Sequence, residues 1–422
     1  MEATVVVKPV RAHFLLEGSE QQRESSSRAL YSSLREHGYA LLDFSTGVTA
    51  DASYLPPTIG GCIEPVKKFF AKSEGEKGCY VEKLVEDRLK GYFPHNQKGP
   101  SGKGRPEHYI LWLKEEEDSS KALPLEPDFA ATAQPALAHV AAQSRIILKS
   151  LGEAVNREDR EQFGRLLDPL PVPPGACCCS SASFKLKVLN YSTAAGGGAS
   201  SMPEHVDRGM LTLVVQQASG LEVFDQWHKR WERPPPNSCV LLVGHTLEVA
   251  SGGVFKATKH RVSLSPPPPP PPPPPSPSSS SSLAEAAPVV ANRVSLVFQI
   301  QARSDAVVSQ DNVPPHLRRR TRATVRNKGP VKVEVVLGRF AASHPSVTGH
   351  AHRTIEEDQK GSDKIKKATE RAVGRASASS SRRWKFRWTW GFFSCGSDES
   401  DRFRRTRTNR RPSAAVFGAS AL

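Results

Sequence analysis

In the 422-residue chain, residues 202–207 read MPEHVD and residues 256–264 read KATKHRVSL. In the first, His205 and Asp207 are two residues apart and therefore lie on the same face of an extended segment. In the second, His260 begins a β-rich run 53 residues after Asp207. Two histidines and one carboxylate on a β scaffold form a facial triad, which holds Fe(II) and leaves three coordination positions open. Because the chain has 13 histidines, an exposed turn or a capped loop explains His-x-Asp equally well at this point.

A third segment, Asn292–Gln299, supplies companion residues. It alternates as a strand does, with Val294, Leu296 and Phe298 on one face and Arg293, Ser295 and Gln299 on the other. Since a buried guanidinium needs an anion, an arginine with a serine two residues later, facing a metal, would hold the far carboxylate of a dicarboxylate. The near keto-acid end of such a molecule would chelate the iron.

The region after Phe184 has a hydrophobic period of two, which predicts short strands. Its β-rich runs are Phe184–Tyr191, Leu211–Gln216, Leu221–Phe224, Cys239–Val243, Leu247–Ala250, Arg261–Leu264 and Val294–Gln301. Many short strands of this kind are typical of a barrel or jelly roll. Between the last two runs lies Pro266–Pro288, whose ten consecutive prolines cannot join a ladder, so we expect a solvated polyproline II insertion.

The N-terminal half predicts mostly helices. The expected elements are helices at Ser25–Gly38, at Glu64–Lys72 and from Pro135 onward, a strand at Tyr39–Phe44 and a loop at Gly91–Pro106. The helix from Pro135 is long and amphipathic, which suits a helix that covers a sheet.

Taken together, these residues resemble the isopenicillin N synthase-like family of Fe(II)- and 2-oxoglutarate-dependent dioxygenases. That family shows His-x-Asp, then roughly fifty residues, His-Arg-Val, about ten residues and Arg-x-Ser. Here His260 and Arg293 are 33 residues apart, and removal of the 23-residue insertion leaves ten. The resemblance covers residues 25–305, because Leu30–Phe44 and Leu247–Lys256 also recur in the family's order.

The resemblance implies a mainly β fold with a helical cap, an α+β arrangement whose core is a double-stranded β-helix, or jelly roll. We expect an N-terminal segment (1–24), the helical cap (25–160), the β-helix core (181–310) with its Pro/Ser-rich insertion (266–288), and a basic, disordered C-terminal tail (341–422).

The resemblance also implies an oxidoreductase that hydroxylates or desaturates a small organic substrate with O2, converting 2-oxoglutarate to succinate and CO2, with ascorbate as a supporting reductant. It assigns Fe(II) to His205, Asp207 and His260, and 2-oxoglutarate to Arg293, Ser295 and Tyr191. Ser192 aligns with the family's tyrosine as an alternative to Tyr191, and His245 stands where the family often has aspartate.

Three residues are candidates for substrate contacts by their place in the family pattern: Tyr92, His95 and Phe224. Loop packing is the alternative explanation for each of them. The identity of the substrate is not encoded in any shared motif, because specificity in such enzymes depends on cap and loop residues.

The net charge of +15 comes entirely from residues 311–422, since residues 1–310 hold 33 basic and 33 acidic side chains. Within that basic region, Arg382–Phe393 mixes arginine and lysine with aromatic residues, a composition that binds nucleic acid or an anionic surface. Low-complexity drift, or translation of non-coding sequence, is an alternative explanation for the basic tail and the Pro/Ser-rich insertion.

The chain has no stretch of 18 apolar residues and no secretory signal, so we expect a cytoplasmic protein, with the nucleus as the alternative. Its seven cysteines, an odd number, indicate reduced thiols. Two other function classes stay open: a catalytically inactive barrel that serves as a binding module, and a protein that its basic tail recruits to nucleic acid.

Overall fold

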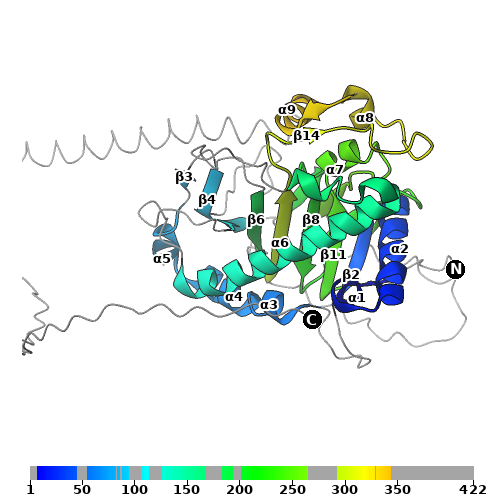
Figure 1. Cartoon of the computed structure of the whole chain (residues 1–422). Coiled ribbons are helices and arrows are strands. Elements are labelled where there is room, and N and C mark those ends of the chain that lie inside the picture. The colour runs from blue at the N-terminus through cyan, green and yellow to red at the C-terminus, as the bar shows by residue number, and fades with distance from the viewer. Residues whose placement is uncertain are drawn as a thin grey trace, which may run out of the picture. The chain divides into compact units, whose positions relative to one another are not determined.

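The computed structural model describes residues 7–44, 55–81, 83–85, 88–94, 106–113, 126–167, 183–192, 201–264, 292–327 and 329–343 (Figure 1). The chain divides into the units Met1–Arg353 and Thr354–Leu422, and every described residue belongs to the first. The predicted Pro/Ser insertion, His95 and the tail from residue 344 lie outside the described residues.

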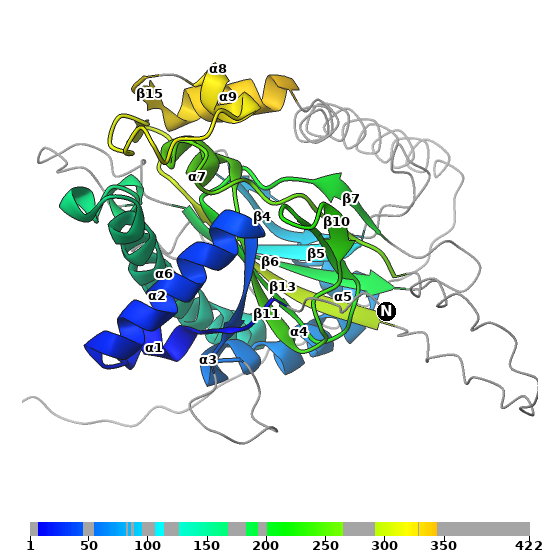
Figure 2. The same ribbon diagram turned by 90° about the vertical axis from the view of Figure 1, so that its right-hand side faces the viewer.

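Two β-sheets form the centre of the first unit (Figure 2). The large sheet has the order β1-β2-β11-β8-β13-β6-β5-β4-β3 and the small sheet the order β10-β9-β12-β7. The large sheet consists of β1 (Val10–Arg11), β2 (Tyr39–Asp43), β3 (Lys83–Val85), β4 (Arg88–Phe93), β5 (Glu107–Trp112), β6 (Ser183–Ser192), β8 (Leu211–Gln216), β11 (Ser238–Val243) and β13 (Asn292–Gln301). The small sheet consists of β7 (Met202–His205), β9 (Leu221–Asp225), β10 (Arg230–Glu232) and β12 (His260–Val262). A separate pair joins β14 (Val307–Val308) and β15 (Val331–Lys332).

The two sheets pack face to face because each has one apolar face. A buried cluster combines Leu189, Tyr191 and Val214 of the large sheet with Val223 and Val262 of the small one. The alternation along β13 sends Leu296, Phe298 and Ile300 to the opposite face, where they join the larger cluster that includes the helices. Arg293, Ser295 and Gln299 therefore point to the side of the small sheet, as predicted.

Helices cover the outer face of the large sheet. They are α1 (Ala12–Glu17), α2 (Glu20–Glu36), α3 (Pro57–Gly60), α4 (Ile63–Ala71), α5 (Glu74–Gly78) and α6 (Pro127–Val155), with 3₁₀ turns at Arg157–Asp159 and Gly164–Leu166. The long helix α6 crosses the sheet and contacts β6 and β13 (Figure 1). At the end of the first unit, α7 (His245–Ala250), α8 (Arg322–Arg326) and α9 (Val333–Ser343) lie near one another. No described helix, α6 included, combines the length and the apolar content that a membrane crossing requires.

Some predicted elements were wrong. Leu247–Ala250 is not a strand but part of α7, all six residues of which are buried. Its apolar Leu247 and Val249 flank Glu248 as they would in a strand, and four residues are too few to show a helical period. The segment Gly91–Phe93, expected to be loop, is the end of β4 and pairs with β5, whereas residues 95–105 lie outside the described residues. The tail expected to be disordered from residue 341 is helical up to Ser343, because α9 buries Val336 and Phe340.

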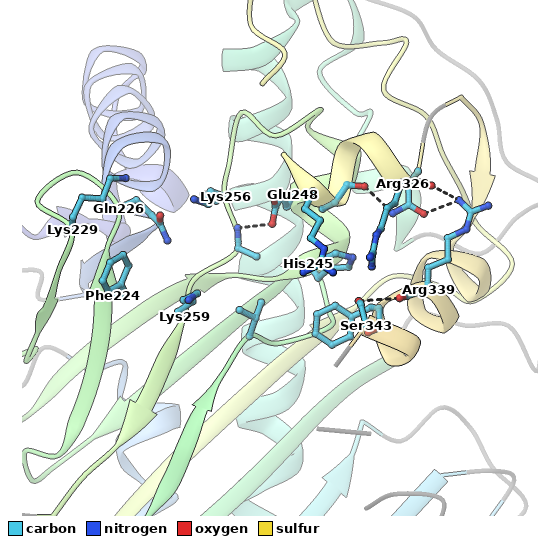
Figure 3. Close-up of a pocket in the computed structure, with 16 residues that line it drawn as sticks. Phe224, Gln226, Lys229, His245, Glu248, Lys256, Lys259, Arg326, Arg339 and Ser343 are labelled. Carbon is cyan, nitrogen blue, oxygen red and sulfur yellow. Dashed lines mark hydrogen bonds between the residues drawn. The ribbon is translucent and has the colours of Figure 1, made fainter. Parts of the chain in front are cut away.

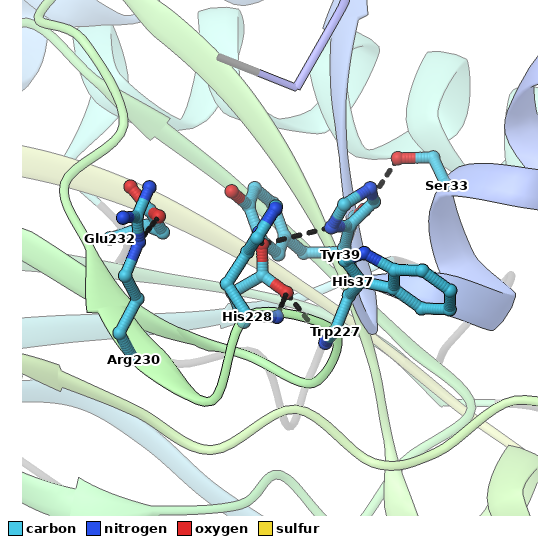
Figure 4. Close-up of polar contacts among 8 residues, drawn as sticks. Ser33, His37, Tyr39, Trp227, His228, Arg230 and Glu232 are labelled. Carbon is cyan, nitrogen blue, oxygen red and sulfur yellow. Dashed lines mark hydrogen bonds and ion pairs between the residues drawn. The ribbon is translucent and has the colours of Figure 1, made fainter. Parts of the chain in front are cut away.

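A cluster of three polar residues joins α2 to the small sheet (Figure 4). The carboxylate of Asp225, which is fully buried, accepts hydrogen bonds from Nδ1 of His37 at 2.9 Å and from Nδ1 of His228 at 2.8 Å. Its other oxygen accepts the backbone N–H groups of Trp227 and His228. Burial opposes ionisation of this carboxyl, but the hydrogen bonds from His228 and His37 outweigh it and hold the pKa of Asp225 below its usual value. We call His37, Asp225 and His228 the Asp225 cluster.

Replacement of Asp225 by alanine is expected to lower the free energy of unfolding by about 2–4 kcal/mol, because four donors lose a buried acceptor. Urea unfolding followed by circular dichroism measures the change. The control is Glu24→Ala, which removes an exposed helical ion pair with Arg28 and should cost less than about 0.5 kcal/mol. Equal losses in the two variants would contradict the importance of the Asp225 cluster.

Candidate metal centre

Strand pairing brings the two predicted histidine ligands together. Strands β7 and β12 are antiparallel with His260 opposite His205, and the two ring centroids are 4.1 Å apart. Asp207 follows β7 by two residues and turns its carboxylate toward both rings. Its oxygens lie 4.0 Å from Nε2 of His205 and 3.7 Å from Nε2 of His260. The three predicted ligands, which come from two distant segments of the sequence, therefore converge on one point.

Hydrogen bonds fix the orientation of each ligand. Nδ1 of His205 donates to the carbonyl of Pro203 at 2.8 Å, and Nδ1 of His260 donates to the carbonyl of Thr258 at 3.1 Å. Since a carbonyl only accepts, both rings carry the proton on Nδ1 and present the lone pair of Nε2 toward the centre. The Asp207 carboxylate accepts from Thr212 Oγ1 at 2.5 Å and from Gln299 Nε2 at 3.1 Å.

The protonation states suit a cation. Burial and the neighbouring His260 lower the pKa of His205, although Asp207 acts in the opposite direction. Burial would raise the pKa of Asp207, but His260, His205 and the hydrogen bond from Thr212 outweigh it and lower that pKa. At neutral pH His205 is thus a neutral imidazole and Asp207 an ionised carboxylate, which are the forms that bind metal. The donor set of two nitrogens and one oxygen fits Fe(II).

A second polar site lies at the other end of β13. Arg293 is 1% exposed, and its guanidinium donates to Gln216 Oε1 at 2.9 Å and to the Ala218 carbonyl at 3.2 Å. The guanidinium lies 5.0 Å from the ring centroid of Tyr191, its partner residue on β6. Gly220 leaves room for this arrangement, because its φ is +138° and a Cβ there would be 3.1 Å from Arg293 Nε.

Two donors at this second site lack a partner among the described residues: Arg293 Nη1 and Ser295 Oγ, both buried. Unpaired buried polar atoms are costly, and those that persist in a native structure call for a missing ligand or water. A carboxylate would accept from both. The site therefore fits the distal carboxylate of 2-oxoglutarate, and the roles assigned to Arg293, Ser295 and Tyr191 stay predictions that this geometry favours.

Two of the predicted substrate contacts, Tyr92 and Phe224, lie among the described residues, and neither faces the triad. Tyr92 is 1% exposed and packs on Phe69 in the helical layer, while its hydroxyl donates to Glu107 at 2.7 Å. This position favours the packing explanation for Tyr92. His95 lies outside the described residues, so its role stays a prediction.

Phe224 lies on the outer face of the small sheet, because its neighbour Val223 belongs to the cluster between the sheets. It lines a cavity of about 490 Å³ together with basic side chains that include Lys229 and Arg326 (Figure 3). Among the described residues that line this cavity, Val206 is adjacent to the triad in sequence, but no triad residue is present. Contact of Phe224 with a substrate at the triad therefore stays a prediction without support from its position.

Sequence reasoning missed two residues that complete these sites: Thr212, which binds Asp207, and Gln216, which binds Arg293. The signal was present in β8, LTLVVQ, where alternation places both polar residues on the face of Val214. Without the fold, nothing linked that face to Asp207 or Arg293.

Comparisons with known proteins agree with this geometry. Residues 184–268 match the model of the 2OG-Fe(II) oxygenase superfamily. The chain is 42% identical over 60 residues to 2-oxoglutarate-dependent dioxygenase FG08081 of Gibberella zeae, a match that covers 14% of this chain and 18% of that protein. It is 24% identical over 204 residues to flavonol synthase 1 of Crocosmia x crocosmiiflora, covering 47% and 58%. The chain thus spans less than two thirds of the curated relatives that it matches.

Solved structures share the fold. A full-length protein from Neurospora crassa, solved in complex with alpha-KG, aligns with a TM-score of 0.57 at 16% identity, over 81% of this chain and 98% of that one. A 2OG-Fe(II) oxygenase family protein from Caulobacter crescentus aligns with a TM-score of 0.56 at 17% identity, over 80% and 98%. The expected jelly-roll fold and the family resemblance are confirmed.

Replacement of Thr212 by valine is expected to weaken Fe(II) binding by roughly tenfold, because Asp207 loses a hydrogen bond that orients it while the side-chain shape is kept. Equilibrium dialysis against Fe(II) without oxygen, or against Co(II), measures the affinity. Thr132→Val is the matched control, since that hydroxyl donates to the Asp128 and Phe129 carbonyls of its own helix α6 and not to Asp207. An unchanged affinity in Thr212→Val would contradict the role of Thr212.

Proposed function

We propose that this protein, a member of the 2OG-Fe(II) oxygenase superfamily, is a non-haem Fe(II)- and 2-oxoglutarate-dependent dioxygenase. It would oxidise a small organic substrate by hydroxylation or desaturation, while O2 and 2-oxoglutarate give succinate and CO2. One observation carries the proposal: the convergent His/Asp/His set and two buried donors without a partner among the described residues, Arg293 Nη1 and Ser295 Oγ, face the same space between the two sheets. The His/Asp/His set would bind Fe(II), and Arg293 with Ser295 would bind 2-oxoglutarate.

The residues of the site would have separate roles in binding the metal. His205, Asp207 and His260 would hold Fe(II), and Thr212 and Gln299 would keep the Asp207 carboxylate oriented. Iron and 2-oxoglutarate supply the oxidising chemistry when they are bound.

The far end of the keto acid would be neutralised by Arg293 and would accept a hydrogen bond from Ser295. The apolar residues between the sheets, such as Val214 and Val262, would exclude water from the reacting atoms.

The substrate class, the cellular location and the role of the basic tail are further parts of the proposal. A small-molecule substrate fits the superfamily, whereas a cytoplasmic location, with the nucleus as the alternative, stays a prediction from the sequence. No comparison supports nucleic-acid binding by residues 311–422, so that role also stays a prediction. An inactive barrel that serves as a binding module would bind no iron and form no succinate, and the next experiment separates it from an enzyme.

Purified protein with Fe(II), ascorbate, O2 and 2-oxoglutarate is expected to form succinate slowly even without added substrate, since such enzymes turn over when uncoupled. Succinate is quantified against a His205→Ala control, in which it should disappear because the metal loses one of three ligands. Absence of both iron and succinate in the wild-type protein would refute the catalytic proposal.

Substitution of Arg293 by lysine is expected to raise the KM for 2-oxoglutarate by roughly 10- to 100-fold, because lysine cannot reproduce the guanidinium fork. Steady-state succinate formation at varied 2-oxoglutarate measures it. Arg303→Lys is the matched control, since Arg303 is equally buried but pairs with Asp305. A KM that rises equally in both variants would indicate a general structural effect instead.

A further inference from the structure

A single row of paired residues crosses four strands beside the metal centre. Strand pairing places Trp112 of β5 opposite Lys185 of β6, Lys185 opposite Gln299 of β13, and Gln299 opposite Thr212 of β8. Directly paired residues project to the same face of a sheet. The side chains of Gln299 and Thr212 both bond to Asp207, so this face is that of the metal centre. Lys185 and Trp112 continue it away from the triad.

The continuation of this face combines cations with aromatic rings. Lys187, two residues after Lys185, shares the face, and its charge acts on His205. On β5 and β4 the face holds Trp112 and the stacked pair of His108 and Phe93, whose ring centroids are 4.4 Å apart. The ammonium of Lys185 lies 5.3 Å from the centroid of Trp112. Such a surface suits a flat apolar molecule with an anionic group.

The balance of charge points to an anion. Bound Fe(II) and the Arg293 guanidinium would together balance the negative charges of the Asp207 carboxylate and the 2-oxoglutarate dianion. These four groups form a neutral set. Lys185 and Arg208 are cations in addition to that set, and Asp207 is the carboxylate whose charge acts on Lys185. Burial lowers the pKa of Lys185 to about 8, against the effect of Asp207 and with that of Arg208. An incoming anion would relieve this cost of burial.

We propose that Lys185 binds a carboxylate of the substrate, whose flat apolar body packs against Trp112. The substrate class of the enzyme is then an organic acid with an aromatic or similarly flat body, held beside the open face of the metal centre. This inference rests on the proposed function, which it makes more specific. Lys185 would act as a specificity-determining residue, because it would recognise the substrate at a group other than the one that reacts.

The test uses matched acids and amides as probes: phenylacetate, 3-phenylpropionate and indole-3-acetate, each with its neutral amide. Calorimetry measures binding to the full-length protein loaded with Fe(II) and 2-oxoglutarate without oxygen. At least one acid is expected to bind roughly tenfold more tightly than its amide, because only the acid forms a charge-assisted hydrogen bond. Phenyl phosphate tests the other common anion, and tighter binding of it than of every acid would overturn the choice of a carboxylate.

Variants of Lys185 test whether this residue causes the preference for the acid over its amide. Lys185→Met keeps the length and removes the charge, and should bring the acid and its amide within about threefold, whereas Lys185→Arg should restore the preference. Lys67→Met, which removes an exposed lysine of α4, should leave the preference unchanged. Thermal midpoints check that each variant folds.

Two results would overturn the inference: no acid preferred over its amide by the wild-type protein, or a preference that survives in Lys185→Met. Succinate formation by the wild-type protein without any probe tests the proposed function separately, so the two failures are distinguishable.

Discussion

The buried carboxylate of Asp207 links the two β-sheets and sets how they pack. It accepts hydrogen bonds from Thr212 and Gln299 of the large sheet and faces His205 and His260 of the small sheet. Removal of this carboxylate from water is costly unless every one of these groups is in place. The two sheets must therefore meet in one register, and that register also sets the position of each side chain along β13.

The same register explains why a second polar site exists further along the central strands. Arg293 and Gln299 are an even number of residues apart on β13, so both share a face, and one binds Gln216 while the other binds Asp207. The interior is thus polar at its two ends and apolar between them, where Val214 and Leu189 pack. This division would keep the proposed cation-binding and anion-binding ends apart, with an apolar region between them.

The surrounding elements stabilise this arrangement without contributing ligands. Helix α6 covers the outer face of the large sheet, and the Asp225 cluster ties α2 to the turn after β9. Strands β4 and β5 extend the large sheet beyond β6, which lengthens the face beside the metal centre and adds Trp112 next to Lys185. The N-terminal half, predicted as a helical cap, thus also builds part of the site wall.

The His/Asp/His set, the Arg-x-Ser pair and most strands were predictable from the sequence, because these depend on local spacing and on alternation with a period of two. Helix α7 was not, since Leu247 and Val249 flank Glu248 as they would in a strand. The partners of Asp207 and Arg293, which are Thr212 and Gln216, became visible only in the folded chain, as did the positions of Phe224, which faces away from the triad, and Lys185, which lies beside it. Those relations arise from pairing between strands distant in the chain, and no local pattern encodes which strand becomes the neighbour of which.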